Sequence, residues 1–291
     1  MQRDLWSMGI IILTLLVIAC GGKYDEVEST LNDYADAMED YIGRMEKADS
    51  AESVVNAMQE YTEKMNALSL ETGEPMVEAI QRLMADDTVS VIILRADGDN
   101  FCTGSDLDLL GDNMDPAYLC GLMNRINAFL FDLHQGPKIV ITEVDGFALG
   151  GGLGLALASD ITVATDQAKF CCGFIRIGAV PDMGVTYFLT ERIGMARARE
   201  IALTGDIIDA GRALEMGLIN RVVSRAEISE EVMKLAARIA KASPEALSLT
   251  KRNLNRARRI DLQTALDLEA HIQPLMLLSD AHKAAIKKML S

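Results

Sequence analysis

Three consecutive glycines, Gly150 to Gly152, stand where a strand is expected to give way to an apolar helix. The stretch FALGGGLGLALASD indicates that the strand ends near Asp145 and that the helix continues to about Ala158. The first amides of a helix have no partner within it and lie at the positive end of its dipole. Without side chains, a ligand oxygen can approach these amides closely. The glycines therefore indicate an anion or oxyanion site, with close packing of backbone against backbone as the alternative.

Known phosphate and metal motifs do not fit this part of the chain. Leu155 stands where G-x-G-x-x-G needs its third glycine, and no Gly-Lys-Ser/Thr follows. Around Asp106, an EF-hand fails because Leu110 and Ala117 occupy ligand positions. The five cysteines form no C-x-x-C pair, and with three histidines no zinc spacing occurs. We therefore predict no metal site, and reduced thiols that are mostly buried.

Alternating strands and helices must position the glycine segment. Strands are expected at residues 88–96, 138–144 and 161–164, and helices at 74–85, 116–133, 195–203, 210–216, 228–240 and 262–278. Strands separated by crossover helices predict an α/β layered core, followed by a mainly helical last third.

Length and charge restrict the class of partner. The chain has 291 residues, 49% of them apolar, which suits one large domain with an appendage. Its formal net charge of −15 argues against a nucleic-acid partner, which needs a basic face. A small anionic ligand remains compatible with this charge, because it needs only a few local amides or lysines.

The N-terminus differs from the rest of the chain. The apolar run Met8–Ala19 is too short for a comfortable membrane span and ends in VIAC before two glycines. This layout resembles a bacterial lipoprotein signal, in which Cys20 would carry a lipid that tethers the chain to a membrane. An uncleaved hydrophobic anchor and a misassigned start codon are the alternatives. We predict a signal-like segment over residues 1–20.

An acidic helical segment is predicted over residues 21–62. Residues 23–64 hold twelve Asp and Glu against four Lys and Arg. Apolar residues recur there at steps of three and four, the spacing of one helical face. Such a face packs on its own neighbour or serves as a partner-binding arm, and the segment carries no catalytic signature.

A second motif decides how the glycines are interpreted. FCTGSDL, residues 101–107, follows the first expected strand through the turn DGDN. With ALGGGLG at this separation, it resembles the crotonase superfamily, the enoyl-CoA hydratase/isomerase family. Further matches are KMNALSLE at 64–71, ASDITVATDQAKF at 158–170, IGAVPDMGVTYFL at 177–189, ALTGDIIDAGRALEMGLINRVV at 202–223 and SPEALSLTKRNLNRA at 243–257.

This resemblance covers roughly residues 63–290. It implies a crotonase-like (ββα)-type spiral core with a helical C-terminal region, preceded by the N-terminal helical segment. A crotonase-like acyl-CoA domain is accordingly predicted over residues 63–291.

The resemblance also implies where an acyl-CoA thioester would bind. The family's oxyanion hole corresponds to the backbone amides of Ser105 and Gly151, which would donate to the thioester oxygen. Two such amides stabilise the enolate that forms when a proton leaves the carbon beside the thioester. The other implied substrate-binding residues are Thr103, Gly104, Asp106 and Gly150, together with Lys64, Ala67 and Leu68 in the stretch that lines the family's CoA nucleotide site. No separate cofactor is implied, because coenzyme A is part of the substrate.

The two glutamates that the family's hydratases use are absent. Gly154 and Phe174 hold their positions, and adding water across a double bond needs an acid and a base. One carboxylate matches a catalytic position, Asp182 in IGAVPDMG, in family members resembling dienoyl-CoA and ring-epoxyphenylacetyl-CoA isomerases. A lone carboxylate suits a 1,3-proton shift.

The surroundings of Asp182 bear on this role. Apolar neighbours such as Val180, Met183 and Phe174 should raise its pKa and make it a competent base. The alternative is that Asp182 caps the helix expected to begin near Gly184.

The favoured function is thus a double-bond isomerase of fatty acid metabolism, with Asp182 moving the proton. The alternatives are a hydratase-like activity, a dehalogenase-like activity, or a non-catalytic membrane-tethered scaffold that kept the fold. For a dehalogenase, the required histidine has no counterpart in register, because His134 lies too close to the glycine triplet. Since the family usually assembles as trimers or paired trimers, a homotrimer or homohexamer is expected.

The N-terminus conflicts with this function in two ways. CoA thioesters imply a cytoplasmic enzyme, whereas a lipoprotein signal exports the chain. The family also enters KMNALS from a β-strand, but here the preceding residues NAMQEYTEK end the acidic helix. Either the chain is a fusion joined inside the fold, or its sheet is completed in another way.

Overall fold

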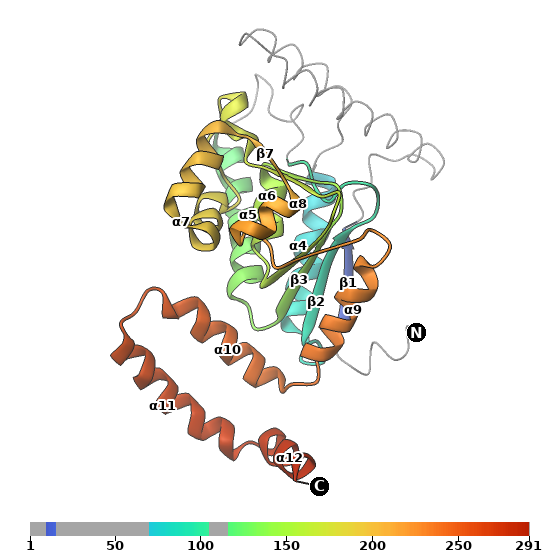
Figure 1. The fold of residues 1–291 in the computed structure, drawn as a ribbon. Helices are drawn as coiled ribbons and strands as arrows, with labels where there is room; N and C mark the ends of the chain where they lie inside the picture. Colours follow the sequence, from blue (N-terminus) through green and yellow to red (C-terminus); the bar gives the residue numbers. More distant parts are fainter. Residues whose placement is uncertain (1–9, 16–69, 105–115, 291) are drawn as a thin grey trace.

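The central sheet of the protein has five parallel strands in the order β1-β2-β3-β5-β8. The computed structural model describes residues 10–15, 70–104 and 116–290 (Figure 1). The five strands are Ile10–Leu15 (β1), Val91–Ala96 (β2), Ile139–Val144 (β3), Ile161–Thr165 (β5) and Arg221–Val223 (β8). The strands expected in the sequence correspond to β2, β3 and β5, so the α/β core is confirmed.

A second sheet has three short strands and carries the glycine segment. Its strands are Phe147–Leu149 (β4), Lys169–Cys171 (β6) and Ile207–Asp209 (β7). β4 pairs parallel with β6, and β6 pairs antiparallel with β7. No strand was predicted between Asp145 and the glycines, but residues 147–149 extend and pair along β6. The partners of such short strands lie far away in the sequence, so local patterns do not reveal them.

Helices cover both faces of the central sheet (Figure 1). They are Leu70–Ala85 (α4), Pro116–Gln135 (α5), Gly151–Leu157 (α6), Val185–Thr204 (α7), Ala210–Met216 (α8), Ile228–Ile239 (α9), Pro244–Ala257 (α10), Leu262–Leu278 (α11) and Asp280–Met289 (α12). The six helices expected from periodicity are present, the one at 195–203 as the second half of the longer α7. Four helices begin with a side-chain cap, from Asp209, Ser243, Asp261 and Ser279.

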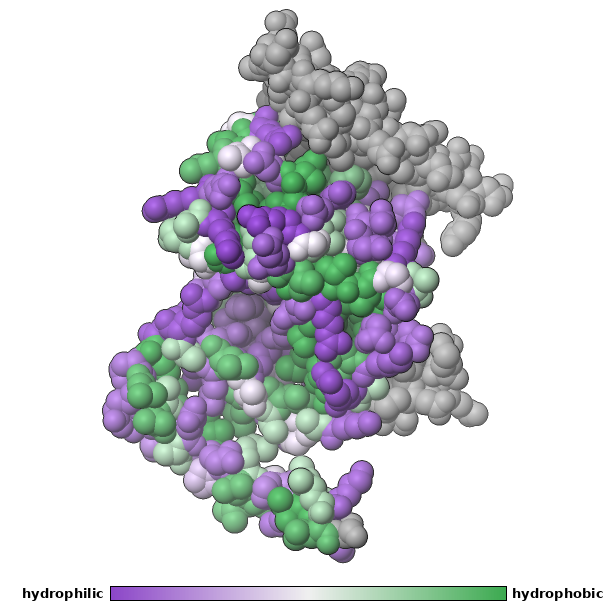
Figure 2. Space-filling model, viewed as in Figure 1, coloured by the Kyte–Doolittle hydropathy of each residue, from purple (hydrophilic) through white to green (hydrophobic). Residues whose placement is uncertain are grey.

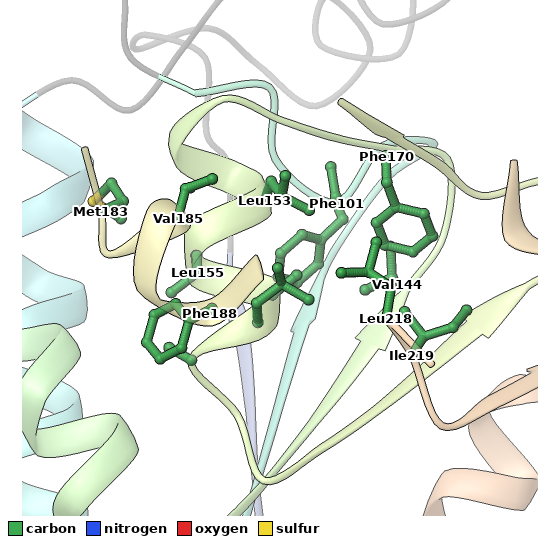
Figure 3. Close-up of a cluster of buried hydrophobic side chains, with 14 of the residues drawn as sticks. Phe101, Val144, Leu153, Leu155, Phe170, Met183, Val185, Phe188, Leu218 and Ile219 are labelled. Carbon is green, nitrogen blue, oxygen red and sulfur yellow. The ribbon is translucent and has the colours of Figure 1, made fainter. Parts of the chain in front are cut away.

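Alternate residues of the central strands enter two separate cores. In β2, Val91 and Ile93 pack with apolar residues of α9, whereas Ile92 and Leu94 belong to the larger core on the opposite face. Burial on both faces is typical of parallel strands and explains their continuous apolar sequence. Figure 3 shows the larger core where Phe101, which follows β2, lies among residues of α6 such as Leu153. The helix that begins with the glycines is therefore packed into this core.

Residues of the apolar N-terminal run form the edge strand β1. Ile10 pairs with Val91, and the parallel register continues to Leu15 opposite Ala96. The sheet is therefore completed by residues outside the resemblance. Of the two alternatives raised by the sequence, a fusion joined inside the fold or a sheet completed in another way, the structure shows the second. One mature chain cannot both keep residues 10–15 in its sheet and lose them as a cleaved signal.

The other N-terminal predictions fall outside the described residues. These predictions are the lipid tether at Cys20, the acidic helical segment and the domain boundary at residue 62. Within the three described ranges, no helix is long and apolar enough to cross a membrane.

A buried lysine fixes the first C-terminal helix against the body. Lys251 of α10 is 4% exposed, and its Nζ donates to the Asp160 carboxylate at 2.8 Å. The same ammonium donates to the carbonyls of Leu133 and Lys138, both at 2.9 Å. Beyond α10, the helices α11 and α12 extend away from the body, and neither has a buried residue among those described (Figure 1).

Candidate active site

The glycine triplet combines the two roles that its sequence left open. Gly150 has a φ of 51°, and α6 begins at Gly151. A β-carbon at Gly152 would lie 2.0 Å from the Cys102 carbonyl oxygen, so this glycine lets two backbones cross. A β-carbon at Gly151 would instead point between Gly104, Met183 and the Asp182 carboxylate. Gly152 therefore serves close packing, while Gly151 borders the small space between Gly104, Met183 and the Asp182 carboxylate.

The FCTG segment lies directly against this space. Gly104 has a φ of 103°, and a β-carbon on it would lie 3.5 Å from the Gly151 nitrogen. A side chain at position 104 would thus cover the amide that the resemblance assigns to the oxyanion hole. Thr103 is half-buried in the same segment. The other predicted substrate-binding residues, Lys64, Ala67, Leu68, Ser105 and Asp106, lie outside the described residues.

Asp182 brings a carboxylate to the same space. Its Oδ1 lies 4.0 Å from the position that a β-carbon on Gly151 would occupy. This oxygen is buried and has no hydrogen-bond partner within the described part of the chain. Burial raises the pKa of the Asp182 carboxyl, because an apolar environment disfavours the charged form. The direction of this pKa shift agrees with the sequence-based prediction.

Asp182 does not cap the helix that follows it. α7 begins at Val185 with Gly184 in the cap position, and no side chain caps it. The contribution of Asp182 is its backbone carbonyl, which accepts from the Val185 amide at 2.9 Å. The capping alternative was therefore wrong, and the carboxylate is left for another role.

Met183 borders the site with its side chain at Gly151 and with its backbone at Gly154. It has a φ of 48°, a conformation that residues with a side chain rarely adopt, and it is 7% exposed. A β-carbon at Gly154 would lie 2.4 Å from the Met183 carbonyl oxygen. Position 154 thus has no room for the glutamate of a hydratase. Figure 3 shows Met183 on the segment that leads into α7, near Val185.

Phe174 borders the site beside Gly150. It belongs to the 3-10 turn Gly173–Ile177 (η2), and its ring lies 3.8 Å from where a β-carbon on Gly150 would be. The second glutamate position is thus filled by a buried aromatic ring. Val180, in contrast, is 80% exposed, so the prediction that it buries Asp182 was wrong. Its side chain faces solvent because the segment before Asp182 runs along the surface.

Adding a glutamate at position 154 is expected to damage the protein without creating a hydratase. In Gly154→Glu, the new side chain overlaps Met183, and overpacking of this kind costs about 1–3 kcal/mol or more of folding free energy. We expect a lower melting temperature and no hydration of crotonyl-CoA. Gly121→Glu is the matched control, because nothing lies within 4 Å of a β-carbon there. A stable Gly154→Glu protein that hydrates crotonyl-CoA would contradict this account of the site.

His134 lies apart from Asp182. Its ring packs edge-on against Tyr187 and Phe188, with centroid distances of 5.8 and 5.2 Å. Burial lowers the pKa of His134 to about 4, so the ring is neutral near pH 7. It lines a cavity of about 120 Å³ whose lining residues include neither Asp182 nor the glycines. His134 therefore does not serve as the histidine that a dehalogenase would need beside Asp182.

The thiols mostly agree with the sequence-based prediction. Cys102, Cys171 and Cys172 are free and buried, while Cys120 is free and exposed. Burial raises the pKa of Cys102 to about 11, so its thiol stays protonated and is a poor nucleophile. Cys102, the thiol next to the candidate site, therefore offers no alternative to Asp182 as a reactive group.

The comparisons with known proteins agree with this site. Residues 50–289 match the family model of enoyl-CoA hydratase/isomerase. The chain belongs to the enoyl-CoA hydratase/isomerase family. A solved family structure, enoyl-CoA hydratase/isomerase from Cupriavidus metallidurans, superposes with a TM-score of 0.72 at 32% identity, covering 77% of this chain and 85% of that one. The crotonase-like fold is thereby confirmed, and the edge strand β1 lies outside the matched residues.

Relatives within the family carry different reaction names. The 1,2-epoxyphenylacetyl-CoA isomerase of Escherichia coli is 36% identical over 216 residues, covering 73% of this chain and 82% of the relative. The short-chain-enoyl-CoA hydratase of Clostridium acetobutylicum is 32% identical over 208 residues, covering 71% of this chain and 79% of the relative. Because the family includes both reactions, the choice between them must come from the residues of the site.

Two features of the site could not be found by pattern. The left-handed Met183 and the close approach of Cys102 to Gly152 depend on backbone conformation, to which the residue type gives no direct signal. Only an indirect indication of this backbone arrangement was present in the sequence, which was a glycine at position 154, where hydratases have a glutamate. The structure explains that glycine as a consequence of Met183.

Proposed function

We propose that this enzyme is an enoyl-CoA isomerase in which Asp182 moves a proton along the acyl chain. The observation that carries the proposal is the buried, unpartnered Oδ1 of the Asp182 carboxylate beside Gly151, where Gly154 and Phe174 hold the positions of the hydratase glutamates. Moving a double bond removes one proton and returns one, so a single base suffices. Hydration would need a second group to act on water.

The steps follow from the groups around the space beside Gly151. The thioester oxygen of a 3-enoyl-CoA accepts hydrogen bonds from the amides of Gly151 and Ser105. Asp182 takes a proton from carbon 2, and the electrons of that C–H bond form a dienolate whose negative charge rests on the thioester oxygen. The same carboxyl then returns the proton to carbon 4, which leaves a 2-enoyl-CoA. Typical losses on removing one oxyanion donor are about 10²–10³ in rate.

The walls of the site support a proton transfer without water. Phe174 and Met183 are 9% and 7% exposed and place apolar groups on two sides of the Gly150–Gly151 floor. Such walls keep solvent from the dienolate, and they keep the pKa of Asp182 raised. The reaction needs no cofactor, since coenzyme A enters with the substrate.

An absorbance assay with the full chain tests the proposed function. The protein is mixed with a 3-enoyl-CoA, and the conjugated 2-enoyl thioester is followed in the ultraviolet. Hydration of crotonyl-CoA is measured in parallel, and binding of an unreactive acyl-CoA is measured by calorimetry. Conversion of the 3-enoyl-CoA supports the isomerase. Hydration without isomerisation would favour a hydratase, and neither conversion nor binding would leave a scaffold that kept the fold.

We also propose that the enzyme is a homotrimer or homohexamer. α11 exposes leucines, for example Leu262 at 74%, Leu275 at 71% and Leu278 at 70%, and α12 exposes Met289 at 82%. Figure 2 shows apolar side chains along this helical arm, away from the body. Several large apolar side chains exposed on one helical arm are typical of an interface. The arm is therefore proposed to pack on other copies of the chain.

Charged residues on the arm are expected to disrupt the assembly. The double variant Leu275→Glu, Leu278→Glu should sediment as a monomer, while the parent sediments at three or six times the chain mass. Leu203→Glu on α7 is the matched control, because that leucine is 69% exposed but lies off the arm. A parent protein that sediments as a monomer at micromolar concentration would contradict the proposed oligomer.

The proposed substrate also bears on localisation. CoA thioesters imply that the enzyme acts in the cytoplasm. A membrane tether at Cys20 stays a separate prediction, because that residue lies outside the described ranges.

A further inference from the structure

We propose that Arg225 is a positioning residue that holds together the two loops of the candidate site, one leading to Gly104 and the other to Gly151. Its guanidinium binds Asp99, at the start of one loop, and Asp145, at the start of the other. The inference rests on the proposed function for its kinetic consequence. Its structural consequence can be measured independently of any reaction.

The parallel sheet brings the three residues to one edge. Asp99 follows β2, Asp145 follows β3 and Arg225 follows β8, so all three lie beyond the carboxyl ends of their strands. Between β3 and β8 in the sheet lies β5, and the guanidinium reaches across its end. Arg225 Nε lies 2.6 Å from Asp145 Oδ2, and Nη2 donates to Asp99 Oδ1. One side chain thus joins the ends of three strands.

The two aspartates begin the loops that form the candidate site. Five residues after Asp99 comes Gly104, and six residues after Asp145 comes Gly151. The loops pair directly, because the Cys102 amide donates to the Phe147 carbonyl and the Leu149 amide donates to the Cys102 carbonyl, both at 2.9 Å. A shift at the start of either loop is therefore transmitted to the place where Gly104 approaches the Gly151 amide.

The start of the second loop has little freedom of its own. Asp145 Oδ1 accepts from the Thr165 hydroxyl at 2.7 Å and from the Gly146 amide at 3.0 Å. A β-carbon on Gly146 would lie 1.9 Å from the Asp99 carbonyl oxygen, so the two loop starts touch. Oδ2 remains for Arg225, which completes the hydrogen bonding of this carboxylate.

Arg225 also neutralises a local repulsion. Without the guanidinium, Asp99 and Asp145 would be two negative charges on adjoining loop starts, in a chain whose net charge is −15. Like charges this close repel even in water. Removing Arg225 therefore does more than delete two contacts, because it leaves a force that separates the loops. A displacement of about 1 Å at a catalytic geometry can cost on the order of 10² in rate.

The solvent exposure of Arg225 makes it possible to distinguish a positioning role from a contribution to global stability. Arg225 is 56% exposed, and solvent-exposed ion pairs contribute little to global stability. Arg212 is a matched control, because it is 55% exposed and pairs with Glu215 at 2.7 Å on its own helix. If Arg225 were an ordinary surface ion pair, Arg225→Ala and Arg212→Ala would behave alike.

Kinetics of the full-length enzyme test the positioning role. For Arg225→Ala we expect kcat for a 3-enoyl-CoA to fall about ten- to a hundredfold, with KM within about threefold of the parent, since the residue does not touch substrate. Arg225→Lys should recover part of the loss, and Arg212→Ala should match the parent. In a background with Asp99→Asn and Asp145→Asn, removing Arg225 should cost little more, because the charges on which it acts are gone. Equal kcat for Arg225→Ala and Arg212→Ala would overturn the proposal.

Hydrogen exchange gives a test without catalysis. In Arg225→Ala, the amides of Cys102 and Leu149 should exchange at least tenfold faster than in the parent, while the amides of β3 keep their rates. Unchanged exchange at Cys102 and Leu149 would refute the clamp even if activity fell. A parent enzyme without isomerase activity would contradict the proposed function, while the exchange result would still decide the role of Arg225.

Discussion

Asp182→Asn is expected to lower kcat for 3-enoyl-CoA isomerisation by at least about 10³-fold, with little change in KM. Asparagine has nearly the same size as aspartate, so the space beside Gly151 keeps its shape, but the amide cannot take a proton. General acid–base catalysis typically contributes about 10²–10⁴ in rate. Here one group performs both transfers, so we expect a loss near the upper end of this range.

The same substitution should leave the fold intact or stabilise it. Burial raises the pKa of Asp182 in the folded state, so above that pKa the folded protein holds a carboxylate that is less stable than in the unfolded chain. The folded state thus binds the proton more tightly, and stability falls as pH rises from the unfolded pKa through the folded one. Asparagine removes this cost, and a melting curve at pH 7 should show an equal or higher midpoint.

The pH profile gives a second readout of the same residue. Because the ionised carboxylate is the base, kcat/KM of the parent should rise with pH through a pKa above the usual range for aspartate. The residual activity of Asp182→Asn should lack this acidic limb. Asp87→Asn, at an exposed position after α4, serves as the control and should reproduce the parent profile.

Two results would contradict this role of Asp182. One is an Asp182→Asn enzyme that isomerises within tenfold of the parent, which would require another base. The other is a loss of activity accompanied by unfolding, which would make Asp182 a structural residue. The buried and unpartnered Oδ1 argues against the second result, since no described contact depends on it.

The sequence predicted the parts of the molecule that local patterns determine. Helices such as 210–216 and 262–278 matched α8 and α11 residue for residue, because a helix is specified by its own periodicity. The three-residue strands β4, β6 and β7 were not predicted, because each forms only against a partner far along the chain. The same reason hid the Arg225 contacts, which join residues up to 126 positions apart.

The candidate site was predicted in its residues but not in its shape. The motifs around Gly151 and Asp182 pointed to two residues that the structure brings together, since Asp182 Oδ1 lies 4.0 Å from where a β-carbon on Gly151 would be. What excludes a glutamate at position 154 is the backbone of Met183, and its φ of 48° has no signature in the residue type. The exposure of one neighbour also differed from the prediction, since Val180 was expected to help bury Asp182 but faces solvent.

The N-terminal apolar run shows where a pattern supports two structures equally. A short, charge-free run of Ile, Leu and Val is typical both of a signal segment and of a buried strand. The structure pairs residues 10–15 with β2 along six positions. The two interpretations make opposite predictions about a chain that begins after Cys20.

A chain that starts at residue 21 is expected to lose most of its soluble, folded protein. Without β1, the backbone groups of β2 along that edge are unpaired, beside side chains of Val91 to Leu94 that are at most 1% exposed. Exposing even half of this apolar surface costs on the order of 5 kcal/mol, comparable with the whole stability of many domains. The unpaired edge also invites association with other strands. Yield, cooperative unfolding and isomerase activity are the measurements.

Cys20→Ser in the full-length chain is the matched control, because it removes the acceptor of a lipid and keeps β1. If β1 belongs to the working enzyme, this variant should match the parent in activity and melting temperature, and mass spectrometry should find residues 10–15 in the purified protein. If the run is a cleaved signal, the mature protein should begin at residue 20 and the chain from residue 21 should fold and isomerise normally. A lipoprotein signal would export the chain, whereas a CoA substrate implies a cytoplasmic enzyme. A working enzyme that retains β1 would resolve this conflict, because residues 10–15 would then be part of the sheet and not of a cleaved signal.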